Sequence, residues 1–226
     1  MEKHINLSKL FEFSDEWDIS FDDVNDCLII DNLYKNAQEI NSWLKNQDYP
    51  LWKYIDPEYT DNTKEYLDCR LSVAWPYDHS IENMSRVLEL CEKYFGRDKE
   101  DLDFLFRLFE FNCFKSLKKF ANSKQHFPHL DDAFGIPDEW STLNMITFLD
   151  QNGNGGTNIY DYNFPDNTEH ENLLFDLSEE HKVSKKIDYK FNRSVLFRGN
   201  KWHGCFIDDY EHYTKNWRYS QVYFIK

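Results

Sequence analysis

The sequence is poor in the residues that mark disordered and low-complexity chains, with 7 glycines and 6 prolines among 226 residues. Its apolar fraction of 41% and aromatic fraction of 18% are ample for a packed interior. A chain of this length can fold around one substantial core, and no linker rich in Gly, Ser or Pro divides it. We therefore expect a single domain over residues 1–226.

Cysteine is also sparse, and its spacing excludes the common cysteine motifs. The five cysteines are scattered, odd in number and form no Cys-x-x-Cys pair, which is typical of reduced thiols. The N-terminus lacks a basic segment followed by an apolar run, so the sequence indicates no signal peptide. No apolar stretch approaches the length of a membrane span. The sequence therefore predicts a soluble, cytoplasmic protein without a membrane partner.

Basic residues are outnumbered, with 26 Lys and Arg against 41 Asp and Glu, and the formal net charge is −15. Binding to a phosphate backbone requires clustered Lys and Arg, so this balance disfavours nucleic acid as a partner.

Hydrophobic patterning predicts an α+β fold. Apolar runs and helical spacing indicate a strand over 27–34, a helix directly after it and a second helix over 80–96. Alternating, Phe-rich or turn-bounded segments then predict strands over 104–114, 142–150, 157–162, 194–199 and 218–226. The expected architecture is a helix-rich part over 1–103 that packs on a strand-rich antiparallel sandwich or barrel over 104–226. The polar segment 166–190 is expected to be an excursion between strands.

The segment "QHFPHLDD" (125–132) carries the first candidate site. Pro128 favours an extended backbone, and residues two apart on a strand share a face, so His129 and Asp131 are expected to project together. An imidazole and a carboxylate are two of the three ligands of a non-haem iron facial triad. A solvated acidic loop is the alternative interpretation. His126 and Asp132 would point to the opposite face and are weaker candidates.

Later segments offer complementary groups. His203 follows an apolar strand in "NKWHGCF", and Arg218 and Ser220 lie two apart on the last expected strand. A buried guanidinium is costly without an anion, and beside a hydroxyl it suits one end of a dicarboxylate. Arg198 is an alternative anchor. Asn144 could donate to the other carboxylate, or could be a satisfied core amide.

The ordered set of His-x-Asp, a strand, a Gly-Gly turn, a second histidine and Arg-x-Ser resembles the Fe(II)/2-oxoglutarate-dependent dioxygenase superfamily. Within it, "FLDQNGNGGTNIY" (148–160) looks like a strand–turn–strand of prolyl-hydroxylase-like members, the branch with an HxD…H…R pattern. The motifs cover residues 120–226, and "IIDNLYKNAQEI" (29–40) resembles the opening of many members. The resemblance implies a double-stranded β-helix (jelly-roll) barrel.

The resemblance also implies a site and an activity. His129, Asp131 and His203 would ligate Fe(II), and Arg218 would bind the C5 carboxylate of 2-oxoglutarate with help from Ser220. With O₂ as the oxidant, the chain would hydroxylate an amino-acid, peptide, protein or small-metabolite substrate and release succinate and CO₂.

Two departures refine this expectation. Prolyl-hydroxylase-like members often anchor 2-oxoglutarate with Lys, so Arg218 does not imply a prolyl substrate. Asp131 stands where halogenating relatives carry a small residue, which favours hydroxylation. The alternatives are a non-catalytic, cupin-like barrel that binds a metal or ligand, and an interaction protein in which the motif is coincidental.

The remaining histidines in polar stretches, His170, His181 and His212, are predicted to be solvated. The aromatic residues Tyr219 and Tyr223 on the last expected strand are predicted to lie in the core or at its rim.

Overall fold

The structure is a computed structural model, and it describes part of the chain. The described residues are 7–46, 53–54, 71–72, 81–98, 100, 104–114, 130, 142–161, 183–209, 211–212, 216 and 218–225. In chain order the elements are α1 (Leu7–Leu10), β1 (Asp18–Asp22), β2 (Cys27–Asp31), α2 (Ala37–Lys45), β3 (Lys53–Tyr54), β4 (Leu71–Ser72), α4 (Ile81–Phe95), β5 (Phe104–Phe114), β6 (Leu143–Phe148), β7 (Gly156–Tyr160), β8 (Val183–Asp188), β9 (Ser194–Arg198), β10 (His203–Phe206) and β11 (Arg218–Ile225).

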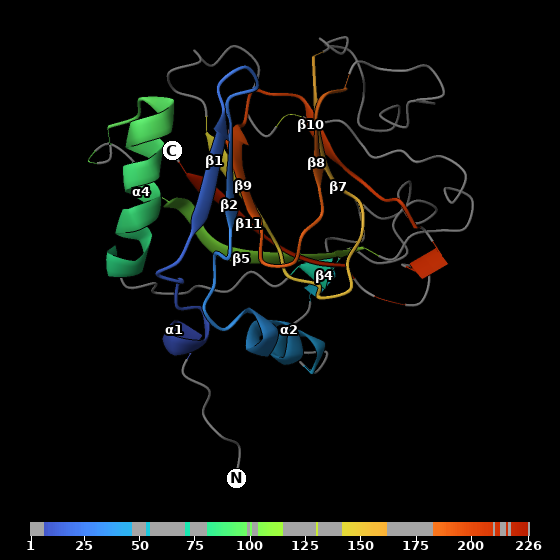
Figure 1. Ribbon diagram of the computed structural model, residues 1–226. Helices are drawn as coiled ribbons and strands as arrows, with labels where there is room; N and C mark the ends of the chain where they lie inside the picture. The colour runs from blue at the N-terminus through green and yellow to red at the C-terminus, as the bar shows by residue number, and fades with distance from the viewer. Residues whose placement is uncertain are drawn as a thin grey trace.

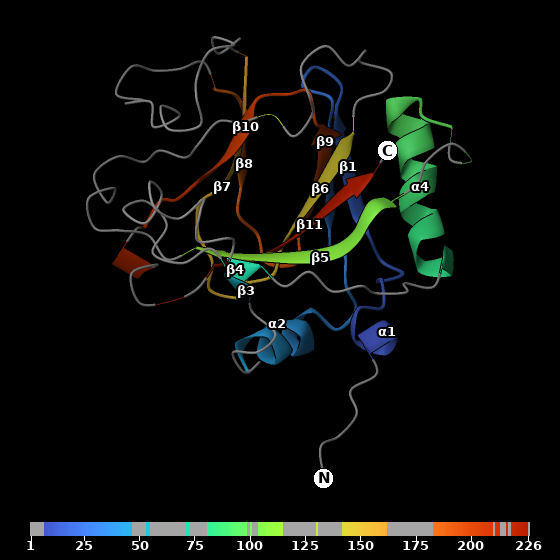
Figure 2. The same ribbon diagram turned by 180° about the vertical axis from the view of Figure 1, so that it is seen from behind.

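The strands form two antiparallel sheets that face each other (Figures 1 and 2). The larger sheet has eight strands in the order β1-β2-β9-β6-β11-β5-β4-β3, and the smaller has three in the order β10-β7-β8. Neighbouring strands in the larger sheet are far apart in sequence, such as β2 beside β9 and β6 beside β11. The architecture is therefore a sandwich-like pair of sheets, in which strands that are distant in sequence pair with each other.

Side-chain alternation gives the larger sheet two apolar faces. In β6, Leu143 and Met145 belong to a cluster with the helices, whereas Ile146 and Phe148 belong to a cluster between the sheets. The buried members of the inter-sheet cluster come from both sheets and are Cys27, Phe148, Ile159, Ile187, Val195 and Phe197. The space between the sheets is thus a packed interior, and the helices form a third layer on the outer face.

The two longer helices pack on that outer face through helical-period stripes. Helix α2 buries Ala37, Ile40 and Leu44 in the same cluster as Met84 and Val87 of α4. The positions expected from the sequence for both helices are confirmed.

Most of the expected strands are present, and Tyr219 and Tyr223 are buried. Strand β8 is a difference, because it lies in the segment expected to be an excursion. It is an edge strand whose residues are mostly solvent-exposed, so its sequence lacks the apolar alternation of a buried strand. Strands β1 to β4 come from before residue 104 and extend the larger sheet. Closure into a double-stranded β-helix and the division at residue 103 stay predictions.

None of the helices in the described ranges has the length and apolar character needed to cross a bilayer.

Candidate functional site

The structure describes four of the six residues predicted for the site. His129 and Asp131 lie outside the described residues, as do the weaker candidates His126 and Asp132. The other four are almost fully buried, with exposed fractions of 2% for His203, 2% for Arg218, 3% for Ser220 and 0% for Asn144. These polar side chains therefore lie inside the protein, where each requires a partner.

Three of them share the inner face of the larger sheet. Ser220 pairs with Phe148, a member of the inter-sheet cluster, so Ser220 and Arg218 face the space between the sheets. The Arg218 guanidinium carbon lies 5.5 Å from the centre of the Phe148 ring. Asn144 pairs with Phe197 and lies on the same face, farther along β6.

Among the described residues, Arg218 is held by a hydrogen bond within this interior. Its Nη2 donates to the carbonyl oxygen of Gly156 at 3.1 Å. Its Nε is buried and has no hydrogen-bond partner among the described residues. Within the same ranges no carboxylate lies within 4.0 Å of the guanidinium. A buried guanidinium without a carboxylate partner can bind an oxyanion with little further desolvation penalty, because the guanidinium has already lost its water on folding.

Arg198, the alternative anchor, has a different environment. It lies two residues after Leu196, which belongs to the helix-side cluster, so it projects away from the space between the sheets. Its Nε is 3.0 Å from an Asp26 carboxylate oxygen, and its Nη2 donates to the Phe95 carbonyl at 3.0 Å. Arg198 is therefore already paired, and the structure brings Arg218 rather than Arg198 into the interior.

His203 begins β10, opposite Ile159 of β7. Its ring centre lies 4.6 Å from that of Phe197, and its Nδ1 is 2.9 Å from the Lys201 carbonyl oxygen. An N–H at Nδ1 that donates to this carbonyl leaves the lone pair on Nε2. This tautomer is the one that metal-ligating histidines adopt when a backbone carbonyl orients the ring.

The Gly155-Gly156 pair, expected to be turn residues, also brings backbones together. Both have positive φ, +80° and +152°. A Cβ on Gly155 would lie 1.9 Å from the Phe206 carbonyl oxygen, and one on Gly156 would lie 1.9 Å from that of Ile187. Only glycine fits this close approach, and it places the Gly156 carbonyl against Arg218.

The strand register sets the spacing of the site. Gly156, at the Arg218 end of β7, lies three residues from Ile159, which is opposite His203. At about 3.3 Å per residue this corresponds to about 10 Å along the strand. His203 and the Arg218 contact therefore lie at two different positions along β7, and both border the space between the sheets.

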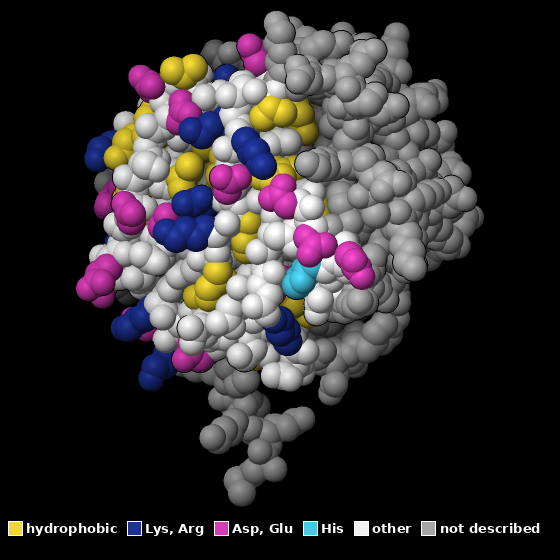
Figure 3. All heavy atoms as spheres, turned by 45° about the vertical axis from the view of Figure 1, so that its right-hand side comes forward, with side chains coloured by type: hydrophobic (Ala, Val, Ile, Leu, Met, Phe, Trp, Pro, Cys, Tyr) yellow, Lys and Arg dark blue, Asp and Glu magenta, His cyan; other side chains and the backbone are white. Residues whose placement is uncertain are grey.

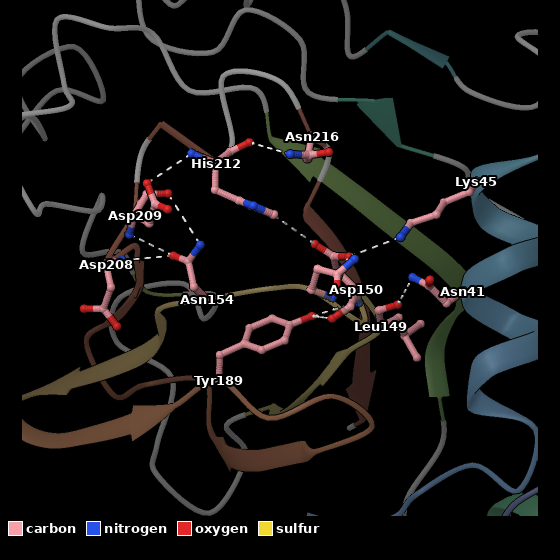
Figure 4. A network of polar contacts seen from close by, with 11 residues as sticks. Asn41, Lys45, Leu149, Asp150, Asn154, Tyr189, Asp208, Asp209, His212 and Asn216 are labelled. Atoms are coloured by element: carbon pink, nitrogen blue, oxygen red, sulfur yellow. Dashed lines mark hydrogen bonds and ion pairs between the residues drawn. The ribbon is translucent and has the colours of Figure 1, made fainter.

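A polar network holds the chain between β10 and β11, the strands of His203 and Arg218 (Figure 4). The Asp150 carboxylate, in a residue 2% exposed, is approached from opposite sides by Lys45 at 3.5 Å and His212 at 4.0 Å (Figure 4). Tyr189 bonds the Asp150 backbone through its hydroxyl, and Asn154 accepts from the N–H groups of residues 208 and 209.

The prediction that His212 is solvated is therefore wrong. Its side chain is 22% exposed, and its buried Nε2 lies 4.0 Å from a carboxylate oxygen of Asp150. Asp150 and His212 are 62 positions apart, and no local pattern signals their contact.

No group of three His, Cys, Asp or Glu side chains within the described ranges is placed to hold a metal ion. His203 is the one predicted metal ligand that those ranges include.

The chain shares its fold with a solved structure of AviO1 from Streptomyces viridochromogenes Tue57. The TM-score is 0.50 at 12% identity, and the match covers 87% of this chain and 88% of that one. At this identity the likeness shows the fold and carries nothing about activity.

Two other solved structures match with lower TM-scores. EvdMO1 has a TM-score of 0.48 at 12% identity, over 83% of this chain and 41% of that chain, so this chain spans under half of its length. An oxidoreductase of the 2OG-Fe(II) oxygenase family from Burkholderia pseudomallei has a TM-score of 0.32 at 13% identity, over 97% and 76% of the two chains. No family model matches the chain. No curated protein matches it either.

Proposed function

We propose that the chain is a non-haem Fe(II)- and 2-oxoglutarate-dependent oxygenase, folded as a double-stranded β-helix, that hydroxylates its substrate. The observation that carries the proposal is the buried Arg218 guanidinium. Its Nε lacks a hydrogen-bond partner among the described residues, and it faces the interior that His203 also lines.

The residues at the Arg218 level fit a carboxylate. Arg218 keeps donor capacity beyond its bond to Gly156, and the Ser220 hydroxyl lies two residues away on the same face. Two donors on one planar cation suit bidentate binding of a carboxylate. Asn144 lies on the same face, four residues from Phe148 along β6, which is about 13 Å, so its contact with the other carboxylate of 2-oxoglutarate stays a prediction.

The residues at the His203 level fit a metal ligand. The Lys201 carbonyl orients the imidazole, and the ring of Phe197 packs against it. His129 and Asp131 would complete the set of three ligands. Fe(II) and 2-oxoglutarate, when bound, would supply the activation of O₂ and the oxidation of substrate with release of succinate and CO₂.

The chain's own part is to hold and orient these groups and to exclude water. The aromatic and aliphatic side chains of the inter-sheet cluster, with Phe148 and Phe197 fully buried, would exclude water from this interior. A dry site strengthens the pairing of a carboxylate with Arg218 and limits side reactions. We propose an amino-acid, peptide, protein or small-metabolite substrate.

The test begins with anaerobic addition of Fe(II) and 2-oxoglutarate, which should produce a weak visible charge-transfer absorption. Admission of O₂ should then convert 2-oxoglutarate into succinate. His203→Ala and Asp131→Ala should lose both signals because each removes a ligand. His212→Ala, a histidine that faces Asp150 instead, should keep them.

The outcomes separate the alternatives. Metal binding without succinate would favour a non-catalytic, cupin-like barrel. Succinate formation retained in both His203→Ala and Asp131→Ala would reject the assignment.

A further inference from the structure

A cavity of about 690 Å³ opens at one end of the sandwich, a volume usual for small-molecule sites. It lies between the β1–β2 turn, the end of α4, the ends of β7 and β9, the start of β8 and the loop before β10. In Figure 1 the β1–β2 turn marks this end of the two sheets at the top of the view. Its walls include the aromatic residues Phe95, Tyr160 and Trp202.

The cavity lies beyond His203 as seen from Arg218. Along β7, Gly156 contacts Arg218, Ile159 is opposite His203, and Tyr160 is part of the cavity wall. Lys201 also links His203 to the cavity. Its carbonyl oxygen accepts a hydrogen bond from the His203 imidazole, and the residue lines the cavity. Along β7, the Arg218 guanidinium therefore comes first, the His203 imidazole next and the cavity last.

The charge of the cavity wall is opposite to that of the chain. Its charged residues are three basic and two acidic, namely Arg97, Arg198, Lys201, Asp26 and Asp161. Asp26 is neutralised by Arg198 at 3.0 Å. Elsewhere the described surface carries interspersed charges of both signs, as Figure 3 shows for one face.

Beyond the Asp26–Arg198 pair, the wall keeps two basic residues, Arg97 and Lys201, against the acidic Asp161. Lys201 is the basic residue whose carbonyl also contacts His203. No carboxylate of the described residues lies within 4.0 Å of its ammonium group, unlike Lys35, Lys45, Lys185 and Lys190, which all form ion pairs. A lysine beside a cavity in a protein of charge −15 creates a local site for an anion.

We propose that this cavity binds the primary substrate, and that the substrate is a small molecule with one anionic group, a carboxylate or a phosphate, held by Lys201. This inference rests on the proposed function for its assignment of the substrate's role. The anion at Lys201 would place the rest of the molecule against Tyr160 and Trp202, next to His203. The co-substrate carboxylate belongs to the separate, interior cation at Arg218.

The experiment uses the full chain and three probes of one shape: phenylacetate, phenyl phosphate and the neutral phenylacetamide. Binding is measured by ligand-observed NMR, with and without 2-oxoglutarate. An anionic probe should bind at least about tenfold more tightly than the amide, since a charged hydrogen bond is worth about that factor. The carboxylate and phosphate arms identify which anion the cavity prefers.

Two variants locate the binding. Lys201→Gln should weaken the anionic probe about tenfold by removing the charge. Lys35→Gln removes the same charge from an exposed lysine that pairs with Glu12, and it should leave the affinity unchanged.

Three results would overturn the inference: no binding of any probe, equal binding of anion and amide by the wild type, or equal affinities in the two lysine variants. Displacement of the anionic probe by 2-oxoglutarate would place it at Arg218 and would also overturn the inference. If the probes behave as expected but 2-oxoglutarate does not bind the wild type, the proposed function fails while the anion site stands.

Discussion

Replacing Arg218 with glutamine tests two effects of this buried cation separately: its effect on the stability of the free protein and its effect on the binding of 2-oxoglutarate. In the protein without co-substrate, Arg218 is 2% exposed, and its guanidinium has a hydrogen bond to Gly156 and no ion pair within the described ranges. Arg218→Gln keeps a donor for that carbonyl and removes a desolvated charge. The melting temperature without ligand should therefore stay equal or rise.

The variant should lose the response to 2-oxoglutarate. A ligand at 100 times its Kd stabilises a protein by about 2.7 kcal/mol, or roughly 5–10 °C in a chain of this size. Loss of a buried charged partner costs about 2–5 kcal/mol of binding, which raises Kd about 30-fold or more. At the same concentration the stabilisation should fall to about 0.9 kcal/mol or less, and the shift in melting temperature to about 3 °C or less.

The assay is thermal unfolding with and without 2-oxoglutarate, and Arg198→Gln is the matched control. Arg198→Gln should lower the melting temperature without ligand, because it leaves Asp26 and the Phe95 carbonyl without their partner. It should keep the shift caused by 2-oxoglutarate. A full shift in Arg218→Gln, or its loss in Arg198→Gln, would refute the assignment of the anchor.

Two further predictions concern the frame of the site. Lys185 bridges the sheets to Asp22 at 2.8 Å, and the hydrogen bond from Lys185 lowers the pKa of Asp22 from 3.8 to about 2. Because the folded-state pKa is depressed, this stabilisation is complete above pH 3.8 and is lost as the pH falls through about 2. Lys185→Met should thus lower the melting temperature by about 2–4 °C near neutral pH, because the near-surface position limits the effect to about 1 kcal/mol. The difference from wild type should be partial at about pH 2, and a difference of undiminished size below that pH would contradict the linkage. Gly156→Ala should prevent normal folding or destabilise the protein far more than Gly96→Ala does. Both glycines have positive φ, but a Cβ on Gly96 would meet nothing within 4 Å. Similar denaturant midpoints for the two variants would contradict the close backbone approach at Gly156.

Local pattern was sufficient for much of the fold. The stripes of α2 and α4 and the strands β2, β5, β6, β7, β9 and β11 could be predicted because periodicity reports which side of an element is buried. The same logic placed Arg218 and Ser220 on one strand face. It missed β8, because an exposed edge strand has no apolar alternation to report.

The sequence by itself determined which residues can form helices and strands, and which polar side chains would be costly to bury. Only the tertiary structure decided that Arg218 faces the interior while Arg198 pairs with Asp26, and that His212 turns toward Asp150. These outcomes depend on pairing between strands and loops that are 60 to more than 170 positions apart, as between Asp26 and Arg198. Side-chain periodicity carries no information about such partners, because they meet only after the sheets have closed.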